Sequence, residues 1–371
     1  MTDDDPPSDG DSGELRTVRR RPFALDLTRP LGTARGDIDR REGFVVTVDP
    51  AGNGSEAVGV GEATPLPGWT ESYEDCGAEL DAVGHGDGSD ALRAESTPAA
   101  RHGVSLALAD AAAREAGRSL AERLANEADV GASPADAVPV NATVGDGSAA
   151  ETAAAAAQAV DEGFDCLKLK VGARDVEGDV ERVRAVREAV GDAVSLRADA
   201  NGAWDREAAR CALDALAAFD LAYVEQPLPV DDLDGLAALR GEARGGAVPV
   251  AADESVAARG IDAVLEADAA DAVVLKPMAL GGPDRALAAA LRARSAGVDP
   301  VVTTTVDAVV ARTAAVHVAA AIPEVSPCGL ATGTLLDEDL APDPCPIDDG
   351  RMAVPTGPGL AGGAFDDLRR E

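Results

Sequence analysis

CLKLKVGARDVEGDVERVRAVREAVGDAVSLRADAN, residues 166–201, contains a strand, a helix and a second strand in the order that a parallel sheet requires. Apolar runs over residues 166–171 and 194–199 predict the strands, and the segment between them predicts a helix over residues 174–190. Two strands that flank a helix form a parallel βα unit. The same alternation extends in both directions along the chain.

From residue 137 to residue 338 this alternation is regular. Further strands are predicted over residues 138–144, 222–225, 248–252, 272–275 and 300–304, with a short last one near 325–330. Helices are predicted over residues 149–162, 205–218, 231–241, 256–267, 282–296 and 307–321. Seven or eight successive units favour an α/β fold of the (β/α)7–8 TIM-like barrel type. A doubly wound open sheet is the alternative, but VNATVGDGSA, residues 140–149, is a poor phosphate-binding turn.

Residues 18–136 are predicted to form an α+β capping domain. Strands are expected over residues 23–28, 44–48 and 57–63, and the turn DPAGNGSE (49–56) between the last two suggests an antiparallel meander. A helix is expected over residues 98–115, residues 84–97 as a surface loop, and residues 1–17 as a disordered acidic segment. After residue 338, strand-like GRMAVP (350–355) and turn-like TGPGLAGG (356–363) predict that a C-terminal tail, 339–371, returns to this domain.

The formal net charge of −34 is spread along all 371 residues. An even distribution argues against an acidic tail or one docking face for a basic partner, and favours adaptation to high salt, which screens self-repulsion. Such a field repels nucleic acid and anionic membrane surfaces. Five cysteines without CxxC spacing, and a polar acidic N-terminus, indicate reduced thiols and a cytoplasmic location. Whether the chain forms a homo-oligomer is left open by the sequence.

Lysine is scarce and therefore informative. Of 33 basic residues only three are lysine, Lys168, Lys170 and Lys276. Lysine can lose its proton at accessible pH and act as a base, whereas arginine effectively cannot. Side chains two apart on a strand share a face, so Lys168 and Lys170 are predicted to point into the barrel together. The alternative for these lysines is ordinary solvation at the barrel mouth.

Three acids stand at the ends of three consecutive predicted strands. Asp199, Glu225 and Asp253 are separated by 26 residues (199 to 225) and 28 residues (225 to 253), about one βα unit each. The C-terminal ends of barrel strands meet at one face, so these acids are expected to be neighbours. Adjacent anions raise one another's pKa unless a cation binds them, and oxygen ligands without His or Cys suit Mg²⁺. The alternative is that each acid forms a salt bridge with Arg197 or with a lysine.

The motifs KLK (168–170), DAN (199–201), VEQPL (224–228), ADES (252–255) and LKP (275–277), in this order, resemble the enolase superfamily and its muconate lactonizing enzyme subgroup. The resemblance implies that Lys170 is the general base and that Lys276 is its counterpart on the opposite face. Lys168 is counted with these two catalytic lysines, because its positive charge would disfavour the charged form of the neighbouring Lys170 amine. It also implies Mg²⁺, with Mn²⁺ as a substitute, held by Asp199, Glu225 and Asp253.

Two further segments indicate the branch of this family. GEATPLPGW (61–69) and SPCGLATGTLLDEDL (326–340) resemble the o-succinylbenzoate synthases, in which the first loop closes over the substrate; a rigid proline-rich hairpin end is the alternative for that loop. The acidic DxD pair of dipeptide epimerases is absent at residues 328–331, and threonines at 303–305 and Asp307 replace the more usual serines and glutamate. The residues expected to contact a small carboxylate substrate are Asn201, Trp69, Thr303, Thr304, Gly329 and Leu330.

The function that the resemblance implies is that of an o-succinylbenzoate synthase-like dehydratase of menaquinone biosynthesis. Lys170 would remove the proton α to a carboxylate, Mg²⁺ would stabilise the enediolate, and water would leave. The alternatives are an isomerase on the same scaffold (N-acylamino acid racemase, dipeptide epimerase or muconate-type cycloisomerase) and a non-catalytic binding protein.

Overall fold

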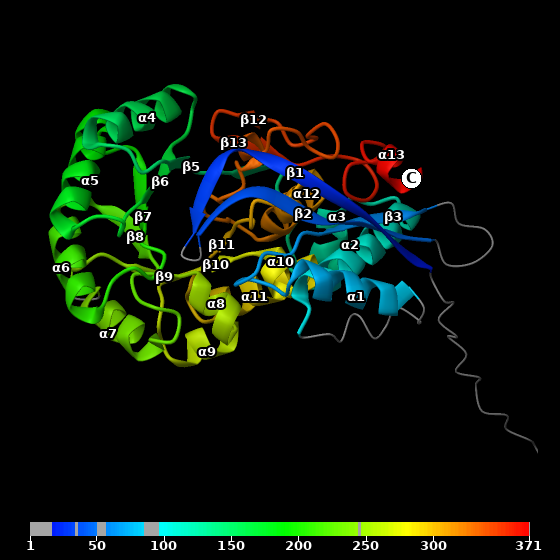
Figure 1. Cartoon of the computed structure of the whole chain (residues 1–371), viewed down its shortest axis with the longest axis horizontal. Coiled ribbons are helices and arrows are strands. Elements are labelled where there is room, and N and C mark those ends of the chain that lie inside the picture. Colours follow the sequence, from blue (N-terminus) through cyan, green and yellow to red (C-terminus); the bar gives the residue numbers. More distant parts are fainter. Residues whose placement is uncertain (1–16, 34–35, 50–56, 85–95, 244–245, 371) are drawn as a thin grey trace, which may run out of the picture.

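The computed structural model describes residues 17–33, 36–49, 57–84, 96–243 and 246–370 (Figure 1). The predicted disordered segment, except residue 17, and most of the predicted loop 84–97 lie outside the described residues.

Three antiparallel strands form the N-terminal sheet, as the predicted meander required. They are β1 (Val18–Thr33), β2 (Gly36–Val48) and β3 (Gly59–Ala63), in the order β1-β2-β3. Helices α1 (Tyr73–Gly84) and α2 (Pro98–Glu115) pack against this sheet. Glycine is required at position 61, because a Cβ there would lie 2.1 Å from the carbonyl oxygen of Gly103 in α2.

Seven parallel strands form the central sheet, and they follow one another in space as they do in sequence. The order β11-β10-β9-β8-β7-β6-β5 contains no reversal, which excludes a doubly wound sheet, whose order reverses at a switch point. The strands are β5 (Ala142–Val144), β6 (Cys166–Lys170), β7 (Ser195–Asp199), β8 (Leu221–Glu225), β9 (Val250–Ala252), β10 (Ala272–Leu275) and β11 (Asp299–Val302).

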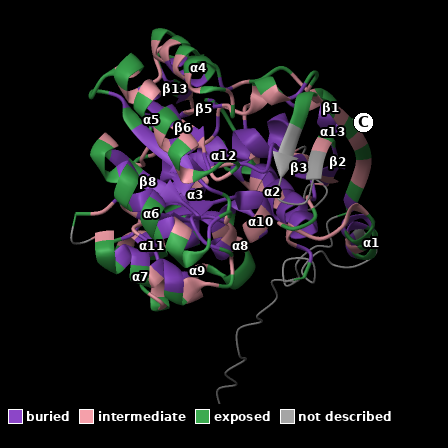
Figure 2. Cartoon of the chain, turned by 60° about the vertical axis from the view of Figure 1, so that its left-hand side comes forward, coloured by how far each residue is buried: buried purple, intermediate pink, exposed green. Residues whose placement is uncertain are grey.

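Helices connect these strands and lie along the outside of the curled sheet (Figure 1). Figure 2 shows exposed outer faces on several of them, including α4 to α7, over a buried interior. The last, α12, is different because all its residues are buried. The helices are α4 (Ala149–Asp161), α5 (Val176–Val190), α6 (Arg206–Leu216), α7 (Leu233–Ala243), α8 (Glu254–Arg259), α9 (Ile261–Glu266), α10 (Pro277–Leu280), α11 (Pro283–Ser295) and α12 (Val309–Ala321). The α/β class is therefore confirmed.

Beyond shifts of their ends, such as β1 over residues 18–33 where 23–28 is predicted, three predicted elements are divided or replaced in the structure. The single strand predicted over 138–144 is divided into β4 (Ala137–Pro139) and β5, because Pro139 has no N–H and β4 pairs with a different sheet. The single helix predicted over 256–267 is divided at Gly260, whose φ of +82° ends α8. In place of a last strand near 325–330 there are only single bridges, from Val140 to Cys328 and from Thr303 to Gly329, which attach this segment to both edges of the central region.

The C-terminal segment contacts earlier parts of the chain at several places. Strands β12 (Ile347–Asp348) and β13 (Arg351–Ala353) join β4 in a small antiparallel sheet. Helix α13 (Asp366–Arg370) brings the guanidinium of Arg369 to 2.9 Å from the carboxylate of Asp110 in α2. Gly359 bridges to Ser119, the residue that caps α3 (Leu120–Glu127).

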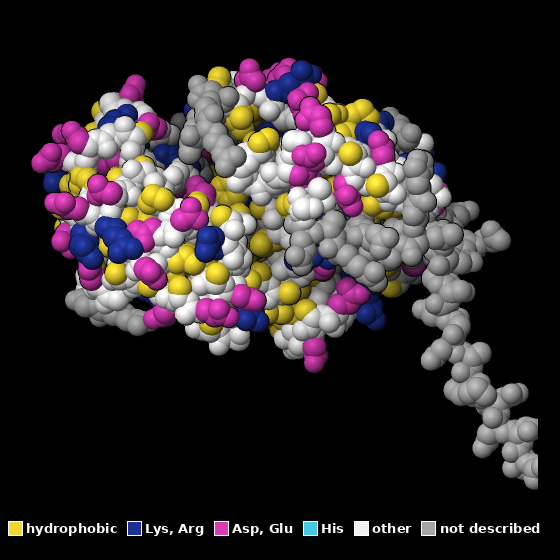
Figure 3. Space-filling model, turned by 60° about the horizontal axis from the view of Figure 1, so that its bottom comes forward, with side chains coloured by type: hydrophobic (Ala, Val, Ile, Leu, Met, Phe, Trp, Pro, Cys, Tyr) yellow, Lys and Arg dark blue, Asp and Glu magenta, His cyan; other side chains and the backbone are white. Residues whose placement is uncertain are grey.

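Acidic side chains are scattered over the visible face of the molecule in Figure 3, with basic ones among them. Among the described helices, none has the length and hydropathy that crossing a bilayer requires.

His317 in α12 gives the fold a pH dependence of known sign. It is fully buried, and its Nε2 lies 2.6 Å from the carbonyl oxygen of Leu360 in the C-terminal segment. Burial lowers the pKa of His317 to about 4, although the Leu360 carbonyl and the charge of Asp110 oppose this. The unfolded state, with a histidine pKa near 6.5, binds the proton first, so this residue's contribution to stability is lost as pH falls below about 6.5.

We predict that acidification from pH 7.5 to pH 5 destabilises the wild type by about 2 kcal/mol more than it destabilises His317→Gln. Urea unfolding of both proteins at the two pH values measures this difference. All other titrating groups are shared, so an equal loss in the two proteins would contradict the assignment.

Candidate active site

Three buried acids converge at the C-terminal ends of neighbouring strands. Asp199 ends β7, Glu225 ends β8, and Asp253 follows β9 directly; their exposures are 1%, 1% and 3%. Asp199 and Glu225 are register partners, and Lys170 of β6 pairs with Asp199 on the other side. The spacing of one βα unit therefore places the three acids at the same end of three consecutive strands.

Lys168 lies between the first two acids. Its Nζ is 2.9 Å from Asp199 Oδ2 and 3.1 Å from Glu225 Oε1. Parity along β6 also directs Lys170 to the same side, where its Nζ is 2.7 Å from Asp199 Oδ2. The side chain of Lys170 is 36% exposed, against 16% for Lys168, so Lys170 is the more accessible of the two amines.

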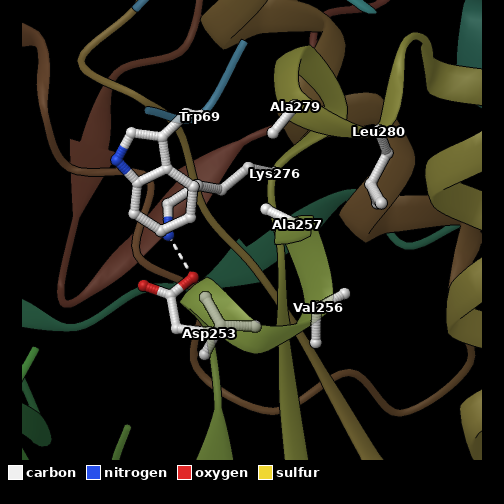
Figure 4. Close-up of a pocket in the computed structure, with 8 residues that line it drawn as sticks. Trp69, Asp253, Val256, Ala257, Lys276, Ala279 and Leu280 are labelled. Carbon is white, nitrogen blue, oxygen red and sulfur yellow. Dashed lines mark hydrogen bonds and ion pairs between the residues drawn. The ribbon is translucent and has the colours of Figure 1, made fainter. Parts of the chain in front are cut away.

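Lys276 reaches the cluster from the end of β10. Its Nζ is ion-paired with Asp253 and lies 3.7 Å from the centre of the Trp69 ring (Figure 4). The pair lines a small pocket with apolar side chains of α8 and α10, namely Val256, Ala257, Ala279 and Leu280. All three lysines are thus paired with acids, so ordinary solvation at the barrel mouth does not describe them.

The charges of this cluster shift the acids in opposite directions. Burial alone would raise the pKa of Asp199, but the ammonium groups of Lys168 and Lys170 outweigh burial and lower it. Burial, followed by the charge of Asp199, raises the pKa of Glu225 to about 7. Burial likewise raises the pKa of Asp253, against the opposing charge of Lys276. The lysines therefore compensate the negative charge of Asp199 well, and the charges of Glu225 and Asp253 incompletely.

The donor set fits a hard divalent cation. It is made of carboxylate oxygens only, which Mg²⁺ prefers, and the raised pKa of Glu225 shows that more positive charge would be accommodated there. In the described part of the chain, no three acidic, His or Cys side chains are already gathered closely enough to hold an ion. Each acid is turned toward a lysine ammonium instead, as in the salt-bridge alternative, but with lysine and not Arg197 as the partner.

Asn201 connects Lys170 to a fourth acid. Its Oδ1 accepts a hydrogen bond of 2.7 Å from Lys170 Nζ, and its Nδ2 donates to Glu254 Oε1 at 3.0 Å. The other oxygen of Glu254 is buried without a hydrogen-bond partner among the described residues. Glu254 belongs to the motif ADES, but nothing in the sequence around Glu254 predicts its hydrogen bond with Asn201.

Two buried side chains that sequence reasoning missed hold the strand ends in place. Gln226 Oε1 accepts hydrogen bonds from the backbone N–H groups of Asp253, at 3.0 Å, and Ser255, at 3.1 Å. Arg182 of α5 donates to the carbonyl of Lys170 at 2.7 Å and is ion-paired with Asp179, whose other oxygen accepts from the Gly172 N–H at 2.6 Å. The backbone on both sides of the cluster is therefore fixed by side-chain hydrogen bonds.

The remaining residues expected to meet a substrate have protein partners in this structure. Thr303 Oγ1 donates to the Gly329 carbonyl at 2.8 Å, and Thr304 Oγ1 lies 3.1 Å from Thr332 Oγ1. A Cβ at position 329 would lie 2.6 Å from Thr303 Oγ1, so glycine is needed for this close approach. Leu330 is fully buried. No contact described here joins these four residues to the acids and lysines.

Comparison with known proteins agrees with this geometry. Residues 151–363 match the family model described as "Enolase C-terminal domain-like". The chain is 44% identical over 215 residues to the o-succinylbenzoate synthase of Thermobifida fusca (strain YX), covering 56% of this chain and 64% of that protein. It is 40% identical over 230 residues to the o-succinylbenzoate synthase of Mycobacterium leprae (strain TN), covering 60% and 64%. The matched part thus spans less than two thirds of these relatives.

Solved structures match over almost the whole chain. The L-Ala-D/L-Glu epimerase of Bacillus subtilis superposes with a TM-score of 0.81 at 28% identity, covering 94% of this chain and 98% of that one. A muconate lactonizing enzyme of Pseudomonas fluorescens gives a TM-score of 0.81 at 25% identity, covering 96% and 98%. Since the family match alone extends over more than half of the sequence, this chain belongs to the enolase C-terminal domain-like family.

Proposed function

We propose that this chain is a Mg²⁺-dependent hydro-lyase of the o-succinylbenzoate synthase type. The observation that carries the proposal is the convergence of all three lysines of the chain on three buried acids at the ends of consecutive strands. The curated relatives at 40–44% identity, named o-succinylbenzoate synthase, support this substrate over others in the family.

Lys170 is the proposed general base. Among the three lysines its side chain is the most exposed, so a substrate proton can reach its Nζ. Asp199 and Asn201 orient the amine through hydrogen bonds of 2.7 Å each. Lys170 takes the proton next to the substrate carboxylate, a carbon–carbon double bond forms, and the β-hydroxyl leaves; the proton and the hydroxide together make one water.

Asp199, Glu225 and Asp253 are the proposed ligands of Mg²⁺, with Mn²⁺ as a substitute. When bound, the cation would neutralise the substrate carboxylate and the negative charge that develops as the proton leaves. Lys168, enclosed between Asp199 and Glu225, would then hold these two carboxylates in place.

Lys276 is proposed to act as a cation and not as a second base. Its ammonium is ion-paired with Asp253 and lies over the face of the Trp69 ring, an arrangement suited to a cation. A dehydration needs one base, whereas racemisation needs two. An isomerase remains the second candidate, because the epimerases and the muconate lactonizing enzyme share the fold.

We also infer the domain organisation from these contacts. Residues 137–338 would form a (β/α)7–8 barrel that the bridges at Cys328 and Gly329 help to close. Residues 18–136 would form the cap, and residues 339–371 would return to it, which the Arg369–Asp110 ion pair supports. Trp69, Asn201, Thr303, Thr304, Gly329 and Leu330 are the proposed surroundings of the substrate.

Turnover tests this assignment. With Mg²⁺ in multimolar KCl, the hydroxy-cyclohexadiene dicarboxylate precursor should lose its diene absorbance in the presence of the wild type. Lys170→Ala should lower kcat by about 10²- to 10⁴-fold, the usual contribution of a general base. Lys276→Arg should keep part of the activity, because the charge is retained. Arg210→Lys, in an exposed ion pair on α6, is the matched control and should leave turnover unchanged.

Turnover of an N-acylamino acid without turnover of the diene would move the assignment to a racemase. So would complete loss of activity in Lys276→Arg together with exchange of the substrate α-proton from both faces.

Mg²⁺ should also stabilise the folded protein. A site that binds only the native state adds about 2.7 kcal/mol when the free ion is at 100 times its Kd. We predict that added MgCl2, at constant multimolar KCl, raises Tm in the wild type but not in Glu225→Gln or Asp253→Asn. Glu242→Gln, in the exposed pair with Arg210, is the control for a lost surface acid. Equal Tm increases in all four proteins would place the ion elsewhere.

A further inference from the structure

Arg41 is a buried guanidinium that joins two loops beside the candidate active site. It lies on β2 and is 3% exposed. Its donors reach the carbonyl oxygens of Thr64 at 2.9 Å, Pro65 at 3.1 Å and Val306 at 3.2 Å. Within the described chain, each of these hydrogen bonds ends on a backbone carbonyl and not on a carboxylate.

A guanidinium suits this task because its five N–H donors lie in a fixed plane. Burial is the main effect that lowers the pKa of Arg41, and the carboxylates of Asp307 and Glu62 oppose it. The positive charge is therefore compensated from nearby, while the hydrogen bonds remain available for the two loops.

The first loop carries Trp69. Beyond Thr64 and Pro65 it turns tightly, since the Trp69 N–H donates to the Leu66 carbonyl at 2.9 Å and the Leu66 N–H donates to Thr70 Oγ1 at 2.7 Å. At its far end, the carboxylate of Glu71 accepts from the Ala99 and Ala100 N–H groups at the start of α2. The loop is thus held at both ends, and the Trp69 ring rests on Lys276 (Figure 4).

The second loop follows β11 and contains a strained residue. Val306 has φ of +60°, a left-handed conformation that is unfavourable for a β-branched side chain. Arg41 binds its carbonyl, and Thr304 Oγ1 accepts from its N–H at 3.2 Å. Strain of this kind persists only where the surroundings over-determine it, and it clusters at functional sites.

We propose that Arg41 is a positioning residue, which fixes the Trp69 loop against the loop after β11 and thereby keeps the indole on Lys276. The inference rests on the proposed function, because Trp69 and Lys276 belong to the proposed site. Arg41 itself touches neither Lys276 nor the acids; it acts through the backbone of residues 64–65 and 306.

Tryptophan emission tests this role without reference to any reaction. The chain has two tryptophans, Trp69 and Trp204, so a Trp204→Phe background reports on Trp69 alone. Arg41→Lys in this background keeps the charge but removes the planar fork. We expect red-shifted emission and an increased acrylamide quenching constant, with an unchanged Mg²⁺-dependent rise in Tm. For the diene substrate, kcat should fall by roughly 10- to 100-fold, with a smaller change in KM.

Arg369→Lys is the matched control, since Arg369 is also buried and also donates to a backbone carbonyl, that of Gly362. It should leave the emission and quenching of Trp69 as in the parent. If Arg41→Lys does not fold, the same measurements on Arg41→Lys combined with Val306→Gly apply, because glycine adopts a positive φ without strain.

Unchanged emission and quenching of Trp69 in a folded Arg41 variant would overturn the inference. This test can fail independently of the proposed function. Turnover of an N-acylamino acid and not of the diene by the wild type would refute the dehydratase assignment. The response of Trp69 emission to Arg41→Lys would still decide the positioning role.

Discussion

Charge compensation inside the barrel-like sheet is the constraint on which the rest of the structure depends. Asp199, Glu225 and Asp253 are almost completely removed from water, and an isolated buried carboxylate is strongly unfavourable unless a cation or hydrogen bonds compensate it. Three lysines supply that compensation in part, and the raised pKa of Glu225 marks where it is incomplete. A chain that uses arginine for its other 30 basic residues (33 − 3) keeps lysine at these three positions.

Buried carboxylates with compensating hydrogen bonds also connect the N-terminal sheet to the rest of the structure. Glu62, at the end of β3, accepts hydrogen bonds of 2.8 Å from the N–H groups of Ala308 and Ala311 at the start of α12, whose own N-terminal groups would otherwise be unsatisfied. Asp110 of α2 accepts from Val60 at 3.0 Å, from Leu360 at 2.8 Å and from Arg369 at 2.9 Å. These buried acids connect the N-terminal strands to α12 and to the C-terminal segment. Acidic residues on the visible face of the molecule, by contrast, are dispersed (Figure 3).

Local pattern was enough to predict most of the framework and the centre of the site. The predicted helix 98–115 and the predicted strand 272–275 have the observed ends, and parity along β6 correctly placed Lys168 and Lys170 on the same side. The division of residues 137–144 between two sheets could not be predicted, because it depends on the distant partner β13. Glu254, Arg182 and Arg41 were missed for a related reason. Apart from Asp179, three residues before Arg182, their partners given above are backbone atoms or an amide distant in sequence, and no spacing rule points to them.

We propose that one divalent cation lies among oxygens of Asp199, Glu225 and Asp253, with Lys170 and Lys276 on either side. Anomalous diffraction from crystals grown with Mn²⁺ tests it directly. We expect one strong peak about 2 Å from an oxygen of each of the three acids. Acids that remain paired with Lys168, Lys170 and Lys276, with no peak among them, would contradict it and leave a cluster of buried salt bridges in its place.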